Sequence, residues 1–425
     1  MPSVYQVSTR DQFQIAIICA LPVEADAVGV VLDETYEEPD GALDSKLPDD
    51  PNRYTLGRIG PHPVVLVQLP GLGTLNATIG SGYLKRQFLK VHLALVVGIC
   101  GVIPRLPDGT DVFLGDVVIS VKAPRKADAV SDGLALSPTR DLPAVQQALA
   151  SYLQVTQRSS GEPKYHYPGA DHDRLFPARY QHRHPDSTPC DLCSRYSCTE
   201  GPGCIDTFHL SCQELECDHH VERSQIRRRS DESPSGTVPS PRVFYGEIGC
   251  TDLVMRSGED RDRFAAEQAV IGFEMEGAGV ELYLPSSVVV VKGGCDYADS
   301  HKEKRWQPYA ALSAACCVKA LLTEVAGESQ GLGKEAWGGD QASLSVAQGG
   351  PRFGEHGVSS LPWEFCVGRR QPYKWNFVIL GHLDTACNVI GWKVSQTPDN
   401  ASQATRSALY VDFRDASDIS TLLAR

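Results

Sequence analysis

Short runs of consecutive apolar residues, separated by segments with helical spacing, organise most of this chain. The apolar runs occupy residues 14–20, 63–68, 92–98, 117–121 and 287–292. Helical spacing of apolar positions is found at 22–32, 74–90, 142–155 and 308–326. A strand buried on both faces is apolar at successive positions, and strands that alternate with helices favour a parallel or mixed sheet. The pattern therefore predicts an α/β domain.

This pattern is interrupted once and then ends before the chain does. Residues 13–120 and 243–326 carry it, whereas 121–242 hold one predicted helix, a cysteine-rich segment and a linker at 227–241. Ser, Pro and charge dominate that linker, so we expect it to be disordered. Residues 327–425 begin rich in glycine, which is typical of a flexible linker, and form a tail of unknown role. The prediction is one α/β domain with a long insertion and a tail.

The net charge of the chain limits the classes of partner that it is expected to bind. Formal net charge is −13, which argues against nucleic acid or an anionic membrane surface as a partner. A small anionic ligand needs only a local group of N–H donors, so it stays open. No apolar run is long enough to span a bilayer, and no basic segment precedes the first run as in a signal peptide. The sequence therefore predicts a cytoplasmic protein without a membrane partner.

Several predicted strands lead into glycine-rich or acidic turns. Examples are the turns at 19–24, 70–76, 98–101, 272–279 and 293–301. In open α/β sheets, ligands bind beyond the carboxyl ends of the strands, so these turns are where a site is expected. The residues of these turns and their order along the chain resemble those of the nucleoside phosphorylase-I family, which includes purine and uridine phosphorylases and the methylthioadenosine/adenosylhomocysteine nucleosidases. Residues 273–279 and 295–302, followed by 305–309, are similar to the form found in filamentous fungi. The resemblance implies a three-layer αβα sandwich around a mixed, partly barrel-like sheet.

The resemblance also implies roles for three acidic residues in cleavage of an N-glycosidic bond. Glu24 aligns with the glutamate that activates water in the nucleosidases, and Asp296 with the acid that protonates the leaving base. Glu276 aligns with the glutamate that binds the ribose hydroxyls. The alternative is that each of the three has a structural role, as a carboxylate in the first turn of a helix or as a cap of a loop. Asp299 and His301 either act directly or brace the same loop.

A second set of residues is expected to line the nucleoside pocket by the same resemblance. These are Gly73, Gly98, Cys100, Phe273 and Met275. Ile99 and Cys100 replace the small Ser-Ala pair usual in nucleosidases, which leaves the preferred base open.

Cysteines crowd the insertion. Cys190 and Cys193 form a C-x-x-C pair, and Cys212 and Cys217 follow within the same segment. In an intracellular chain this density favours structural zinc over disulfides, with unligated thiols as the alternative. We name these four as the predicted ligands, and no cofactor is expected for catalysis.

Three functions remain open at this stage. The favoured one is hydrolysis of a purine-type nucleoside or nucleotide to free base and ribose. A phosphorylase giving ribose-1-phosphate is the alternative, with Arg53 or Arg58 supplying charge for phosphate. The third is a non-catalytic nucleotide-sensing module. The family resemblance further implies a homo-oligomer.

Overall fold

A computed structural model describes residues 9–36, 46–120, 138–184, 188, 190–194, 204–217, 225–226, 239–284 and 288–325, together with 363–366, 376–383, 389–397 and 409–411. It divides into two compact units, residues 1–339 and 340–425. Among the described helices, none combines the length and apolar character needed to cross a membrane.

The first unit is built on a nine-stranded sheet in the order β10-β9-β6-β11-β5-β1-β4-β3-β2. The strands are β1 (Ile15–Cys19), β2 (Glu34–Tyr36), β3 (Arg53–Ile59), β4 (His62–Gln68), β5 (Leu93–Val102), β6 (Val117–Ser120), β9 (Val243–Cys250), β10 (Val270–Glu274) and β11 (Val288–Asp296). A further pairing of β10 with β5 closes five of these strands into a barrel. The expected mixed, partly barrel-like sheet is thereby confirmed.

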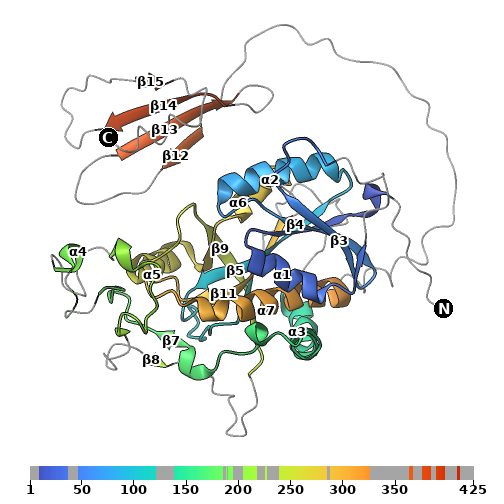
Figure 1. Cartoon of the computed structure of the whole chain (residues 1–425), viewed down its shortest axis with the longest axis horizontal. Helices are drawn as coiled ribbons and strands as arrows, with labels where there is room; N and C mark the ends of the chain where they lie inside the picture. Colours follow the sequence, from blue (N-terminus) through green and yellow to red (C-terminus); the bar gives the residue numbers. More distant parts are fainter. Residues whose placement is uncertain are drawn as a thin grey trace, which may run out of the picture. The chain divides into compact units, whose positions relative to one another are not determined.

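Helices cover both faces of this sheet, as Figure 1 shows. On one face α1 (Pro22–Val31), α3 (Pro138–Ser160) and α7 (Gln307–Ala320) contact one another, and on the other α2 (Thr74–Gln87) contacts α6 (Gly277–Glu281). Alternate residues of β1 enter the two apolar cores, Ile15, Ile17 and Cys19 on the α1 side and Ala16 and Ile18 on the α2 side. This burial on both faces explains why β1 is apolar at every position.

The parallel strands β1, β4, β5 and β11 end at one edge of the sheet. One prediction at this edge was wrong: residues 98–101 do not form a turn, because β5 continues through them to Val102. They pair with both β11 and β10, and those hydrogen bonds override the local preference of glycine for a turn.

The insertion and the tail contain short elements of their own. The insertion has α3, the short strands β7 (Arg174–Leu175) and β8 (Gln225–Ile226), and α4 (Asp191–Ser194). Between β9 and β10 lies α5 (Gly258–Gln268). Most of the predicted linker at 227–241 lies outside the described residues. The second unit holds an antiparallel sheet of β12 (Trp363–Cys366), β13 (Asn376–Leu383), β14 (Val389–Thr397) and β15 (Leu409–Val411).

Candidate functional site

A cavity of about 220 Å³ opens at the carboxyl ends of the parallel strands. Six residues singled out in the sequence line it: Glu24, Cys100, Phe273, Met275, Glu276 and Asp296. They come from four separate regions of the chain, so only the sheet topology brings them together. Gly73 lies in the turn between β4 and α2. Its backbone N–H donates a hydrogen bond to Glu276, which lines the cavity.

Glu24 lies in the first turn of α1 and is 2% exposed. Its Oε2 accepts hydrogen bonds from the backbone N–H of Ala20 and of Leu21, each at 2.9 Å. Its Oε1 accepts from the N–H of Ile99 on β5, also at 2.9 Å. A Cβ on Gly98 would lie 2.0 Å from that Oε1. Gly98 therefore makes room for the Glu24 carboxylate.

Lys292 of β11 lies beneath the cavity and was missed in the sequence. Its Nζ donates to Oε2 of Glu276 at 2.9 Å and lies 3.7 Å from Oε2 of Glu274. All three side chains are at least 96% buried, since their exposed fractions are 1%, 4% and 1%. The sequence did contain a signal for this residue, since Lys292 ends the otherwise apolar run at 287–292. A lysine in a buried strand needs carboxylate partners for its ammonium.

Burial and charge shift the pKa values of this group in a consistent way. Burial raises the pKa of Glu24, and the nearby Lys292 only partly offsets this. Burial alone lowers the pKa of Lys292, but Glu276, Glu24 and Glu274 together raise it well above its ordinary value. The three carboxylates thus favour the protonated, positively charged form of Lys292.

Glu276 is oriented by contacts on both of its oxygens. Besides the bond to Lys292, its Oε1 accepts from the backbone N–H of Gly73 at 3.1 Å. Gly73 adopts φ +97°, a conformation that favours glycine, and it precedes α2. Glu274 in turn accepts from the backbone N–H of Glu276 and of Gly277. The carboxylate of Glu276 is therefore held in one position at the cavity wall.

Asp296 lines the cavity from the end of β11. Its Oδ1 accepts from Nζ of Lys302 at 2.6 Å and from the N–H of Ala298 at 2.9 Å. Arg256, which also lines the cavity, has a pKa lowered by burial and partly restored by Asp296. Its guanidinium lies 4.2 Å from the ring centre of Phe208, a cavity residue from the insertion. Neither Arg256 nor Phe208 was recognised in the sequence, because neither stands in a glycine-rich turn.

Asp299 and His301 do not line the cavity. The carboxylate of Asp299 accepts from the N–H of His301 at 2.9 Å, and burial raises its pKa to about 6. The ring of His301 stacks on Phe176 with 3.9 Å between centroids, and burial holds its pKa well below the usual value. Of the two expected readings, the geometry fits the bracing role, in which this loop is fixed against the insertion.

The four predicted metal ligands fall into two separate groups. Cys190 and Cys193 gather with His184 and Cys204, whereas Cys212 and Cys217 gather with His182. The predicted set of four is corrected accordingly, because the pair Cys190 and Cys193 and the pair Cys212 and Cys217 have different neighbours. Spacing along the chain could not reveal His184 or Cys204 as partners.

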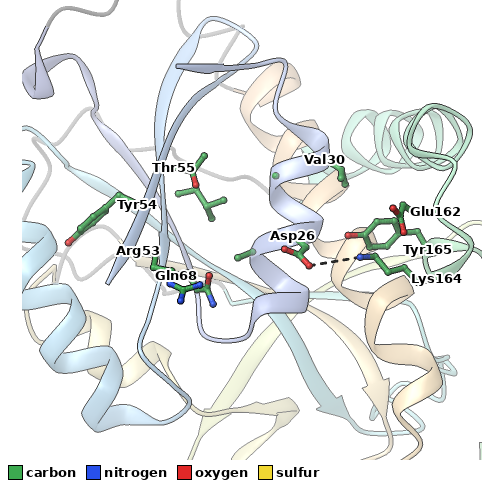
Figure 2. Close-up of a pocket in the computed structure, with 12 residues that line it drawn as sticks. Asp26, Val30, Arg53, Tyr54, Thr55, Gln68, Glu162, Lys164 and Tyr165 are labelled. Atoms are coloured by element: carbon green, nitrogen blue, oxygen red, sulfur yellow. Dashed lines mark ion pairs between the residues drawn. The ribbon is translucent and has the colours of Figure 1, made fainter. Parts of the chain in front are cut away.

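A larger cavity, of about 560 Å³, lies between α1, β3, β4 and the segment after α3. Figure 2 shows Asp26 of α1 directed toward Lys164, with 3.9 Å between carboxylate and ammonium. Arg53 lines this cavity and not the one at Glu24. Arg58 is paired with Glu34 at 3.3 Å. Neither of the two arginines considered for phosphate therefore lies at the first cavity.

Comparison with known proteins gives distant matches. No protein-family model matches the chain. A nucleotide-binding leucine-rich repeat (NLR)-like protein from Hyaloscypha variabilis is 28% identical over 335 residues, which cover 73% of this chain but only 29% of that protein. The chain thus corresponds to under a third of its curated relative.

Solved structures similar to this chain include nucleosidases. The 5'-methylthioadenosine/S-adenosylhomocysteine nucleosidase from Neisseria meningitidis is 15% identical, with 73% of this chain and 98% of that one covered and a TM-score of 0.37. The enzyme from Streptococcus pneumoniae is 18% identical over 73% of this chain and 100% of its own, with a TM-score of 0.38. Futalosine hydrolase of Helicobacter pylori is 13% identical over 74% and 98%, with a TM-score of 0.38.

Proposed function

We propose that the domain with this cavity hydrolyses the N-glycosidic bond of a purine-type nucleoside or nucleotide to free base and ribose. The observation that carries the proposal is the buried group of Glu24, Glu274 and Glu276 around Lys292, directly beneath the cavity. Three carboxylates against one ammonium leave an excess of negative charge there when all are ionised. As the bond breaks, positive charge develops at the anomeric carbon, and fixed negative charge stabilises it.

Each residue has a role that its contacts support. Glu24 takes a proton from the water whose oxygen bonds to the anomeric carbon, and its raised pKa makes it a stronger base. Asp296, in its protonated form, delivers its proton to the base, which leaves with the electron pair of the broken bond, and Asp296 is left as the carboxylate that pairs with Lys302. Glu276 accepts hydrogen bonds from the ribose hydroxyls, and Lys292 holds Glu276 in position. Cys100, Phe273 and Met275 form the pocket around the nucleoside, and no cofactor takes part.

The same charge excess favours water over phosphate as the attacking group. A phosphate dianion placed near Glu24 and Glu276 would be repelled by both carboxylates. Phosphorolysis is the second candidate, since Arg256, Lys302 and Lys304 line the cavity on the side of Asp296. The two candidates differ in their product, which is ribose in one case and ribose-1-phosphate in the other.

The deciding experiment measures base release from adenosine, inosine, methylthioadenosine and ATP, with and without phosphate. Without phosphate we expect ribose from adenosine and inosine, and the correspondingly 5′-substituted ribose from methylthioadenosine and ATP. Glu24→Gln should lower kcat about 100-fold or more. Glu259→Gln is the matched control, because Glu259 is 53% exposed and paired only with Arg179 in the salt bridges of the described residues. Product formed only with phosphate would establish the phosphorylase. Binding of these compounds without any base release would establish the sensing module.

We also propose that the domain forms at least a dimer. Leu75 and Ile79 lie one turn apart on α2 and are 71% and 42% exposed, and Leu282 and Tyr283, at the end of the contacting helix α6, are 65% and 37% exposed. Adjacent exposed apolar side chains of this size are typical of an interface. Light scattering of the wild type and of Leu75→Glu tests this: the variant should be monomeric, and a monomeric wild type would refute it.

A further inference from the structure

The insertion contains four potential ligands with the spacing of a tetrahedral metal centre. Sγ of Cys190 lies 3.8 Å from Sγ of Cys204. Nδ1 of His184 lies 3.6 Å from Sγ of Cys193 and 3.8 Å from Sγ of Cys204. All four ligand atoms lie within 4.8 Å of one another.

These separations match the edges of a zinc tetrahedron. Zn–S bonds of about 2.3 Å and Zn–N bonds of about 2.0–2.1 Å give edges of about 3.8 Å between two sulfurs and about 3.6 Å between sulfur and nitrogen. A disulfide would instead bring two sulfurs to about 2.05 Å. Three cysteines and one histidine form a ligand set that selects Zn²⁺ over the oxygen-preferring Ca²⁺ and Mg²⁺. We propose that His184, Cys190, Cys193 and Cys204 bind one structural Zn²⁺.

The local fold supports such a centre. Among the described residues of the neighbouring part of the insertion, a small apolar core is made by Phe176, Tyr180, Cys212, Leu215 and Cys217. Segments with so little buried apolar surface usually need a metal or disulfides to be stable. The guanidinium of Arg183, beside His184, donates to the carbonyl of Cys193 and further fixes the C-x-x-C turn.

The metal centre would also hold one wall of the cavity. Thr207, three residues after Cys204, donates its hydroxyl to the carbonyls of Cys204 and His182 at 2.7 and 2.9 Å. The next residue, Phe208, lines the cavity beside Arg256. On the other side, the N–H of His182 donates to Ser300 at 2.9 Å, in the loop that follows Asp296. Zinc at this centre therefore fixes Phe208 and supports that loop, whichever reaction the cavity performs.

The neighbouring group of His182, Cys212 and Cys217 is a separate feature. Both ring nitrogens of His182 are buried without a hydrogen-bond partner in the described part of the chain. The group offers three ligand atoms, one fewer than a closed structural zinc site. The proposal concerns the first group only.

The test measures the metal content of the full chain, purified with zinc in the growth medium, by inductively coupled plasma mass spectrometry. We expect at least one zinc per chain, and one ion fewer in both Cys204→Ser and His184→Ala. Cys317→Ser is the matched control, because Cys317 is a buried cysteine in α7, far along the chain from the ligands, and should leave the content unchanged.

Cobalt substitution keeps the proposal testable if the variants do not fold. Replacement of zinc by Co²⁺ in the wild type should produce the visible bands of a tetrahedral site and the near-ultraviolet bands of thiolate-to-cobalt charge transfer. A wild-type chain without bound metal would overturn the proposal. It would also be overturned if folded Cys204→Ser and His184→Ala kept the wild-type content. Neither result depends on nucleosidase activity, so this proposal and the proposed function fail independently.

Discussion

Replacement of Lys292 by methionine should destabilise the first unit strongly. Methionine keeps much of the volume of lysine but removes the ammonium that lies 2.9 Å from Oε2 of Glu276 and 3.7 Å from Oε2 of Glu274. Glu274 keeps its two backbone N–H donors, so the loss falls mainly on Glu276. Removing one partner of a buried ion pair costs about 3–5 kcal/mol. Against a typical domain stability of about 5–15 kcal/mol, this is a large fraction.

The loss should also depend on pH. Burial raises the pKa of Glu24, and Lys292 partly offsets that rise, so without the ammonium the pKa of Glu24 in the folded state rises further above the unfolded value. The folded variant then binds more protons than the unfolded chain at moderately acidic pH, and its stability falls as pH rises. The difference between wild type and Lys292→Met should therefore be smaller at pH 5.5 than at pH 8.

Urea unfolding followed by circular dichroism and tryptophan fluorescence measures both effects. Lys319→Met is the control, because Lys319 pairs with Asp33 at 2.6 Å while their side chains are 14% and 30% exposed. Because this pair is partly exposed, water screens it, and its loss should cost less than that of the fully buried Lys292. The reasoning would be refuted if Lys292→Met lost no more stability than Lys319→Met. It would also be refuted if the loss were the same at both pH values.

Three further outcomes are expected. Gly98→Ala should reduce base release about 100-fold, since its Cβ would displace the Glu24 carboxylate, whereas Gly29→Ala, with open space around its Cβ, should retain activity. Asp299, with a folded pKa of about 6, stabilises the fold at low pH and loses that contribution as pH rises from about 4 to 6. The unfolding free energy of the wild type minus that of Asp299→Asn should therefore fall over that interval by at most about 3 kcal/mol. Equilibrium unfolding at several pH values measures this difference, and a difference that does not change with pH would contradict the prediction. A strong chelator should lower the midpoint of thermal unfolding by several degrees, and added zinc should restore it; scanning fluorimetry that shows no change would count against a structural metal.

Local patterns in the sequence were sufficient for the class of fold and for many site residues. Short continuous apolar runs are typical of strands covered on both faces, and this pattern predicted β1, β4, β5 and β11 within a few residues. Motif order placed Glu24, Glu276 and Asp296 at one edge of the sheet, where the cavity lies. Their catalytic roles remain predictions.

Long-range contacts decided what local patterns could not. The barrel closes through the pairing of β10 with β5, which lie far apart in the sequence. Residues 98–101 stay in a strand because they pair with β11, and Gly101 pairs with β10 as well. The role of Lys292 depends on three carboxylates that the fold brings close to it from other segments of the chain. The grouping of His184 and Cys204 with Cys190 and Cys193 likewise depends on the tertiary fold of the insertion. Sequence determines which side chains are available, but distances of a few ångströms between distant segments exist only after the chain has packed, because tertiary contacts set them.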